Sequence, residues 1–239
     1  MRESLLTIPI NEVFEPNEEG LHEGCPFCKM RDTVENHICE YIMGAAMMEP
    51  DVRQDTNALG FCHRHYLNLL GQKNRLSLGL MLNSHLEQVR SEIFSKKGLF
   101  DALKADKRSE KAAKSQESCF VCSKVSWGMN HMVKTFFTLF REQEYFKQLF
   151  AEQEFICMPH YAWVRGLAPD FLKKGELSEF SFALDELVGV YAASLNKDVA
   201  MFCDSFDYRN AGKLHTPEYE HVRTSVNRSI EFLTGRKPN

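Results

Sequence analysis

A four-residue ligand pattern occurs twice in this chain and constrains its fold more than any other feature. The first copy is Cys25-Pro26-Phe27-Cys28, followed after 33 residues by Cys62-His63-Arg64-His65. The second copy is Cys119-Phe120-Val121-Cys122, followed after 34 residues by Cys157-Met158-Pro159-His160. Six of the eight cysteines lie in these two copies. Thiols and imidazoles at this spacing are typical of metal sites, so the repeat predicts two Cys3His centres.

The two copies together select the histidine of the first site. His63 and His65 both follow Cys62, but the second copy has Met158 at the position of His63 and His160 at that of His65. We therefore predict that His65 is a ligand and that His63 lies outside the site. Each copy is expected to bind its own zinc ion, which gives two per chain. The predicted ligand sets are Cys25, Cys28, Cys62 and His65 for the first ion, and Cys119, Cys122, Cys157 and His160 for the second.

Four protein ligands leave no coordination position for water or substrate, which is more typical of structural than of catalytic zinc. Such an ion clips two helix starts together, and its binding free energy contributes to folding. An iron–sulfur protein, buried thiols without metal, and a redox or metal sensor that releases its ion on oxidation remain alternatives. A thioredoxin-like role is disfavoured because no βαβ pattern surrounds either Cys-x-x-Cys. Covalent c-type haem is excluded because Lys29 and Ser123 stand where that motif requires histidine.

Apolar residues recur at three- and four-residue steps through most of the chain, and strand-like alternation is nearly absent. This pattern predicts an all-α fold with two pseudo-repeated helical halves, each clipped by a Cys3His site. Within it, the segment 51–60 is expected to be a polar loop, and a last helix is expected to begin near Thr216-Pro217. The predicted organisation is an extended N-terminal arm (1–24), a first metal-binding repeat (25–100), a linker or exposed helix end (101–117), a second metal-binding repeat (118–210) and a C-terminal helix (211–239).

Composition excludes several classes of partner. The net charge of −4 provides no basic field for nucleic acid, and no run of about 18 apolar residues is present to span a membrane. The first 20 residues lack the pattern of a signal peptide, and eight cysteines without an export signal favour thiolates in a cytoplasmic protein. The expected role is a binding or regulatory module with a protein or small-molecule partner, and no pattern sets an oligomeric state.

An enzyme with a pocket between the two halves is the main alternative. The polar cluster Glu49–Asn57 lies between the ligand pairs of the first copy only, and its Asp51 and Arg53, with His37, are the candidates for acid–base chemistry. His37 and His131 occupy equivalent positions, nine residues after the second cysteine of each copy. The simpler interpretation of the cluster is a solvated loop, and that of the histidines is a shared helix position. Cys39 and Cys203 have no counterparts in the repeat and are expected to be buried as small apolar residues.

Four motifs together carry a resemblance to a known family. They are Thr7-Ile8-Pro9-Ile10-Asn11-Glu12, Gly24-Cys25-Pro26-Phe27-Cys28, Met48-Glu49-Pro50-Asp51-Val52-Arg53 and Gly60-Phe61-Cys62. With these motifs the chain resembles an uncharacterised group of bacterial proteins described as a domain of unknown function. The resemblance extends from the N-terminal arm to Phe206-Asp207-Tyr208-Arg209-Asn210. It implies no activity, but it makes the polar cluster Glu49–Asn57 part of the family pattern.

Overall fold

The computed structural model of this chain describes residues 7–94, 105–207 and 219–238. Within these ranges the chain forms twelve α-helices and one short 3-10 helix, with no β-strand. The all-α class predicted from the periodicity of the sequence is therefore confirmed. None of the described helices combines the length and the hydrophobicity that a membrane-spanning segment needs.

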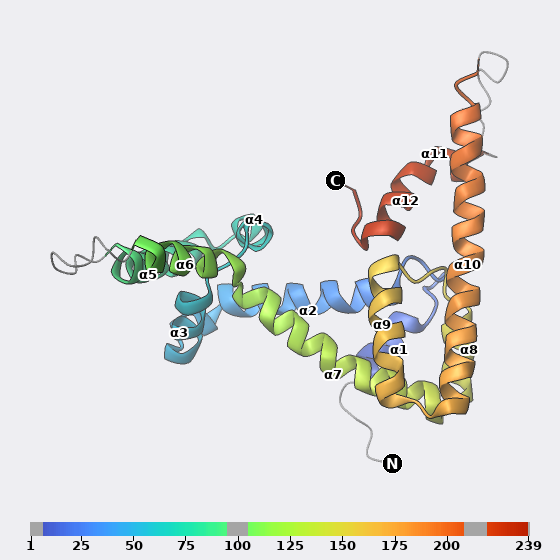
Figure 1. Ribbon diagram of the computed structural model, residues 1–239, viewed down its shortest axis with the longest axis horizontal. Coiled ribbons are helices and arrows are strands. Elements are labelled where there is room, and N and C mark those ends of the chain that lie inside the picture. Colours follow the sequence, from blue (N-terminus) through green and yellow to red (C-terminus); the bar gives the residue numbers. More distant parts are fainter. Residues whose placement is uncertain (1–6, 95–104, 208–218, 239) are drawn as a thin grey trace. The chain divides into compact units, whose positions relative to one another are not determined.

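Figure 1 shows the helices in their order along the chain. They are α1 (Thr7–Phe14), α2 (Pro26–Met43), η1 (Ala45–Met48), α3 (Pro50–Leu59), α4 (His63–Gly71), α5 (Arg75–Ile93), α6 (Ala105–Glu117), α7 (Phe120–Glu142), α8 (Glu144–Ala151), α9 (Met158–Phe171), α10 (Lys174–Asp204), α11 (Glu220–Arg223) and α12 (Ser225–Thr234).

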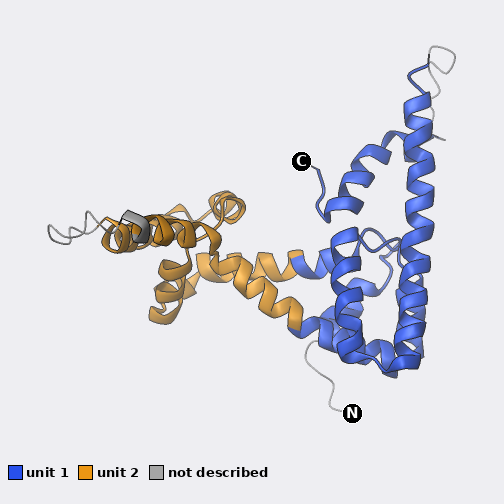
Figure 2. Cartoon of the chain, in the orientation of Figure 1, with its two compact units in different colours: residues 1–31, 131–239 blue, residues 32–130 orange. Residues whose placement is uncertain are grey.

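The chain divides into two compact units, which Figure 2 shows in different colours. Unit 1 comprises residues 1–31 and 131–239, and unit 2 comprises residues 32–130. The chain passes from unit 1 into unit 2 along α2 and returns along α7. Unit 2 is therefore one continuous segment inserted between the two parts of unit 1.

The core of unit 1 is built mainly from phenylalanine rings. The ring centroid of Phe136 lies 5.0 Å from that of Phe27, 5.5 Å from that of Phe14 and 5.7 Å from that of Phe146. Aromatic pairs at such distances add about 0.5–1.5 kcal/mol each beyond the burial of their area. Because Phe27 lies between Cys25 and Cys28, this core fixes the start of α2 and the thiols on it. The phenylalanines that are less than 2% exposed are Phe14, Phe27, Phe136, Phe137, Phe140, Phe146, Phe150 and Phe180.

A buried carboxylate holds the C-terminal helix α12 against α10. Asp198 of α10 is only 6% exposed, and its Oδ2 accepts a hydrogen bond of 2.7 Å from Nη2 of Arg228 on α12. Beside this ion pair, the ring centroids of Tyr191 and Phe232 lie 5.4 Å apart. A charged pair that is mostly withdrawn from water is costly to break, since either partner alone would leave a buried charge. The end of α12, at Gly235, is thereby fixed in unit 1.

In unit 2, α3 packs on α5 through polar contacts. The Nη2 atom of Arg53 donates to the Ser84 hydroxyl at 2.8 Å, and Nδ1 of His85 lies 2.7 Å from the carbonyl oxygen of Asn57. Gly60 ends α3 with a φ of 57°, and a Cβ atom added there would lie 2.7 Å from Nε2 of His85. Only glycine fits this close approach without displacing the imidazole.

The end of α3 also pairs with the start of α7. The backbone N–H of Phe120 donates to the carbonyl oxygen of Gly60 at 2.9 Å. Cys62 lies two residues after Gly60, and Cys119 immediately precedes Phe120. This hydrogen bond therefore brings together two cysteines that are distant in the sequence.

Two segments differ from their predicted structure. The arm predicted to be extended contains α1, where Pro9 lies in the first turn and its missing N–H removes no helical hydrogen bond. The stretch predicted as a polar loop forms α3, because Pro50 occupies the first turn and starts a helix instead of only ending the preceding one. α6 covers residues 105–117 of the predicted linker or exposed helix end. The helix start predicted near Thr216-Pro217 lies outside the described residues.

Candidate metal centres

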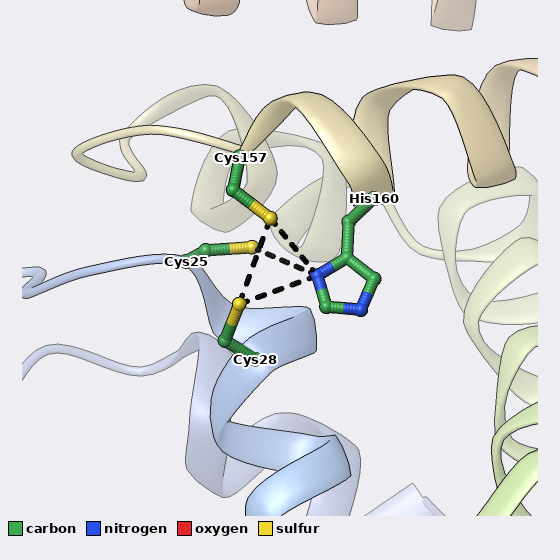
Figure 3. A group of neighbouring side chains, drawn as sticks. All are labelled: Cys25, Cys28, Cys157 and His160. Carbon is green, nitrogen blue, oxygen red and sulfur yellow. Dashed lines mark hydrogen bonds between the residues drawn. The ribbon is translucent and has the colours of Figure 1, made fainter. Parts of the chain in front are cut away.

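Four of the predicted ligands converge in unit 1, where the starts of α2 and α9 meet (Figure 3). The Nδ1 atom of His160 lies 3.1 Å from Sγ of Cys157, 3.4 Å from Sγ of Cys28 and 3.6 Å from Sγ of Cys25. The Sγ atoms of Cys28 and Cys157 are 3.6 Å apart. All four side chains are buried. We call this group, Cys25, Cys28, Cys157 and His160, the unit 1 cluster.

The other four predicted ligands converge in unit 2, at the starts of α4 and α7. The Nδ1 atom of His65 lies 3.2 Å from Sγ of Cys62, 3.2 Å from Sγ of Cys119 and 3.4 Å from Sγ of Cys122. The Sγ atoms of Cys62 and Cys122 are 3.9 Å apart. We call this group the unit 2 cluster. The structure places His65 inside it and leaves His63 exposed.

The structure corrects the pairing of the ligands. Each cluster combines the Cys-x-x-Cys of one copy with the Cys-x-x-His of the other, whereas we expected each copy to close on itself. Both motifs are local turns, so their spacing does not determine which two helix starts meet. The 18-residue helix α2 carries the chain about 27 Å along its axis after the first Cys-x-x-Cys. The second ligand pair then remains in unit 2 and does not return to the first.

The geometry of both clusters suits a tetrahedral metal ion. In each one the four ligand atoms lie within 4.8 Å of one another. Zinc bound at about 2.3 Å from sulfur and about 2.0–2.1 Å from nitrogen separates its ligand atoms by roughly 3.5–3.8 Å. The distances of 3.1–3.9 Å within the clusters approach these values. None of the eight cysteines forms a disulfide, so all six cluster thiols are free to bind metal.

Helix starts position the thiols and favour their ionised form. Cys62 and Cys157 are the N-cap residues of α4 and α9, and Cys25 and Cys119 immediately precede α2 and α7. Unpaired backbone N–H groups and the positive end of the helix dipole stabilise a thiolate at such positions. The backbone N–H of Cys122, for example, lies 3.5 Å from Sγ of Cys119.

One thiol in each cluster has a low pKa. In the unit 1 cluster, hydrogen bonds from the Cys25 and Cys28 thiols lower the pKa of Cys157 to about 4. In the unit 2 cluster, burial raises the pKa of Cys119, but hydrogen bonds from His65 and from the backbone of Cys122 outweigh burial and lower it to about 6. Each cluster therefore holds a thiolate at neutral pH, and thiolates are the form that binds metal.

The two clusters differ in their access to solvent. All four members of the unit 1 cluster are buried, whereas in the unit 2 cluster Cys122 is exposed and Cys62 is half-buried. Solvent, chelators and oxidants can therefore reach Cys122 and, in part, Cys62 of the unit 2 cluster, while all thiols of the unit 1 cluster are covered by protein.

A buried carboxylate orients the histidine of the unit 2 cluster. Glu35 of α2 is 4% exposed, and its Oε1 lies 3.4 Å from Nε2 of His65. Its charge is balanced by Arg64, whose Nη2 lies 2.9 Å from Oε2, and Asn68 donates a hydrogen bond of 2.7 Å to Oε1. A carboxylate behind a metal-binding imidazole fixes the ring and makes its other nitrogen more basic. This arrangement leaves Nδ1 of His65 facing the three thiols.

The unit 1 cluster is closed by the C-terminal turn and by an arginine. The carbonyl oxygen of Gly235 lies 3.4 Å from Sγ of Cys28 and accepts a hydrogen bond of 2.9 Å from Nη1 of Arg31. The Arg31 charge also contributes to the low pKa of Cys157. Three thiolates and one Zn²⁺ ion carry a net charge of −1, so a nearby guanidinium reduces the cost of burying the site.

The groups around the ligands were not predicted, because the two copies differ there. Glu35 has Met129 as its counterpart in the second copy, and Arg31 has Val125. Comparison of the copies therefore gave no signal for either residue. For Gly235, the sequence Thr234-Gly235-Arg236 is a recognisable helix end, but nothing in it indicates a contact with Cys28 or Cys157.

No hydrogen bond or ion pair in the described parts of the chain joins the residues proposed for acid–base chemistry to one another. Asp51 and His37 are exposed, and Arg53 donates to Ser84. Their catalytic role stays a prediction.

Cys39 is 2% exposed, as expected, but Cys203 is exposed at the end of α10, contrary to expectation. This thiol lies in the last turn of α10, which ends at Asp204.

Comparisons with known proteins identify a family but no characterised relative. No curated protein and no solved structure matches the chain. The match to a family with the description "Family of unknown function (DUF6062)" extends over residues 1–239. This agrees with the resemblance inferred from the sequence motifs. The chain therefore belongs to the DUF6062 family of unknown function.

Proposed function

We propose that this protein is a cytoplasmic binding module whose two units are each folded around one structural zinc ion. The observation that carries the proposal is the convergence of all eight repeat ligands into two Cys3His groups. Soft thiolate ligands with one imidazole in a tetrahedral arrangement favour zinc among the common divalent ions. Four protein ligands close each site, so the ions support the fold and leave no position for a substrate.

Zinc makes a large contribution to stability in sites of this kind. Structural zinc binds zinc-finger peptides with an apparent free energy of about 10–16 kcal/mol at neutral pH, and this energy becomes folding energy. The free thiols of all eight cysteines support the assignment to the cytoplasm, because a reducing compartment keeps thiols available for metal.

Metal analysis of the purified protein tests the proposal. Elemental analysis of the full chain should give two zinc ions per molecule, and replacement by cobalt(II) should produce the visible bands of tetrahedral thiolate coordination. Cys28→Ser should lower the content to one ion, as should Cys122→Ser. Cys203→Ser is the matched control, because this exposed cysteine lies in neither cluster, and it should retain two. Metal-free protein in which all eight thiols react freely would refute the proposal. Iron and sulfide in the purified protein would instead identify the bound group as an iron–sulfur cluster.

A redox-regulated role for the unit 2 cluster is a second candidate, favoured by the exposure of Cys122. A peroxide would oxidise the Cys122 thiolate to a sulfenic acid with loss of hydroxide. Attack by the Cys62 thiolate, whose Sγ lies 3.9 Å away, would then form a disulfide, and the oxygen would leave as water after protonation. In total, two thiolates, one hydrogen peroxide and two protons give one disulfide and two water molecules. The disulfide removes two of the four ligands, so the zinc ion leaves.

The same zinc-loaded protein tests this second role. One equivalent of hydrogen peroxide should release one of the two ions to a zinc-sensitive dye, and mass spectrometry should locate the disulfide between Cys62 and Cys122. A thiol reductant with added zinc should restore the original content. Release of both ions together, or of neither, would show that the exposed cluster has no separate redox function.

A further inference from the structure

An open groove of about 590 Å³ lies in unit 1 along α10, and none of the residues that line it belongs to the unit 1 cluster. Its floor is the middle of α10, and one wall is the segment that connects α8 to α9. Figure 1 shows α10 as a long helix that extends past α8 and α9 in this unit. The volume is in the range of about 300–1,000 Å³ that is typical of ligand-binding clefts.

The α10 side of the groove is an exposed helix face on which apolar and polar side chains alternate. Phe182, Glu186, Val190 and Ser194 follow at four-residue steps, so they lie along one side of the helix over three turns. Phe182 is 72% exposed and Val190 is 61% exposed. The core of unit 1 uses a different face of the same helix, which carries the buried residues Phe180, Leu184, Val188 and Leu195. α10 thus presents a second face, with the large apolar side chains of Phe182 and Val190 on it, that the described part of the chain does not cover.

The groove has acidic but no basic lining residues. Glu154 and Glu186 are its charged members. Glu154 is held in place, since its Oε2 accepts a hydrogen bond of 2.6 Å from the backbone N–H of Gly24. Glu186 is exposed and forms no ion pair with any residue that the structure describes, whereas its neighbour on α10, Asp185, pairs with Arg165 at 3.6 Å. An exposed carboxylate between Phe182 and Val190 favours an occupant that combines apolar and cationic groups.

Length and charge together select the occupant. Phe182 and Ser194 are twelve residues apart, so the face extends about 18 Å along α10, which is three turns of a facing helix. A second copy of this chain, docked through the same face, would bring Glu186 close to its own counterpart, and like charges in an interface are unfavourable. A partner helix with lysine or arginine beside its apolar residues avoids this repulsion and places opposite charges in the interface.

We propose that the α10 groove binds a basic amphipathic helix of a partner protein, with Phe182 and Val190 as apolar anchors and with Glu154 and Glu186 facing its cationic side chains. This inference rests on the proposed role as a binding module and names the site and class of partner. Apolar anchors would supply most of the affinity, as in other helix-in-groove interactions, and the carboxylates would set its orientation and its salt dependence.

A fluorescent fourteen-residue helical peptide of leucine and lysine is the probe, and its leucine–glutamate counterpart is the control peptide. Fluorescence anisotropy with the full-length, zinc-loaded protein should show binding of the lysine peptide, which weakens as salt is added. Phe182→Ala and Glu186→Lys should each weaken this binding at least tenfold. Leu86→Ala and Glu87→Lys, which make comparable changes on an exposed part of α5 in unit 2, should leave it within twofold.

Several results would overturn the proposal. Equal effects of the α10 and α5 variants would show that the peptide adheres to the acidic surface in general. Binding of the glutamate peptide, or no binding of either peptide, would exclude a basic helix. A dimer in sedimentation equilibrium that Phe182→Ala dissociates would assign the face to a second copy. Zinc content is measured in every sample. If the wild-type protein holds two zinc ions but does not bind the lysine peptide, the result counts against the groove alone, whereas absence of zinc from the wild type counts against the proposed function.

Discussion

Gly235→Ala should destabilise unit 1 although Gly235 binds no metal. Gly235 ends α12 in the left-handed conformation, with a φ of 64° and a ψ of 26°. A Cβ atom added there would lie 3.0 Å from Sγ of Cys157 and 3.5 Å from Sγ of Cys28. The substitution therefore combines an unfavourable backbone conformation with crowding of two thiols in the unit 1 cluster.

The magnitude follows from these two effects. A left-handed conformation costs an alanine about 1–2 kcal/mol relative to glycine. Crowding displaces the turn, and this weakens the 2.9 Å hydrogen bond from Arg31 to the Gly235 carbonyl oxygen. A hydrogen bond from a charged donor contributes about 1.5–3 kcal/mol. Partial loss of this bond together with the strain gives an expected decrease of about 2–4 kcal/mol in the free energy of unfolding.

Urea unfolding and zinc transfer to a chromogenic chelator measure the two consequences. Gly166→Ala on α9 is the matched control, because an added Cβ there meets nothing within 4 Å and alanine favours a helix interior by about 1 kcal/mol. The control should be as stable as the wild type or slightly more stable. Gly235→Ala should also release the unit 1 zinc ion at least ten times faster, while the unit 2 ion leaves at the wild-type rate.

Gly235→Asn separates backbone strain from crowding. Asparagine tolerates the left-handed region better than alanine does, but its Cβ atom occupies the same position. We expect this variant to recover about 1 kcal/mol of the loss and to retain the faster release of zinc. If Gly235→Ala and Gly166→Ala gave equal stabilities and equal rates of zinc transfer, the C-terminal turn would not lie on the cluster and the reasoning would be wrong.

Two further substitutions test unit 2. Glu35→Gln removes the charge behind His65 and should weaken zinc binding by the unit 2 cluster about 10–100-fold, with no change at the unit 1 cluster, as measured by competition with a chelator of known affinity. Gly60→Ala places a Cβ atom 2.7 Å from His85 at a φ of 57° and should lower the free energy of unfolding by about 2–3 kcal/mol in urea. The added change His85→Ala should restore about half of that loss, whereas no recovery would show that the imidazole is not the obstacle.

The sequence was sufficient to predict the helical class and to select the residues that form the clusters. Comparison of the copies separated His65 from His63 because only one of them has a histidine counterpart in the second copy. The same comparison could not predict that each cluster combines ligands from both copies. Each motif is a local turn, and its spacing does not determine which helix starts meet. The sequence alone also does not show whether Pro9 and Pro50 interrupt a helix or begin one. A proline breaks a helix interior but is tolerated in a first turn, which is where both residues lie.

Tertiary contacts explain why the surroundings of the ligands escaped prediction. Glu35 reaches His65 only because the middle of α2 lies against the start of α4, and these segments are 30 residues apart in the chain. The C-terminal turn reaches Cys28 across 207 positions of sequence. No periodicity or spacing records contacts of this range. The contact of the C-terminal turn with Cys28 depends on the packing of α12 on α10, which the ion pair between Asp198 and Arg228 stabilises.

The nested pairing of the ligands has a consequence for the order in which the ions bind. The unit 2 cluster is complete within residues 32–130, and its Cys62 and Cys122 are 60 positions apart, whereas Cys28 and Cys157 are 129 positions apart. Closing the longer loop alone costs about 0.7 kcal/mol more chain entropy, and closing the inner loop first shortens the outer one. The unit 1 cluster also requires His160, which follows all of unit 2 in the chain. We therefore expect a metal ion to bind the inner cluster first. Because the four ligands of that cluster lie in one continuous segment, we also expect its ion to leave and return without removing any ligand from the buried unit 1 cluster.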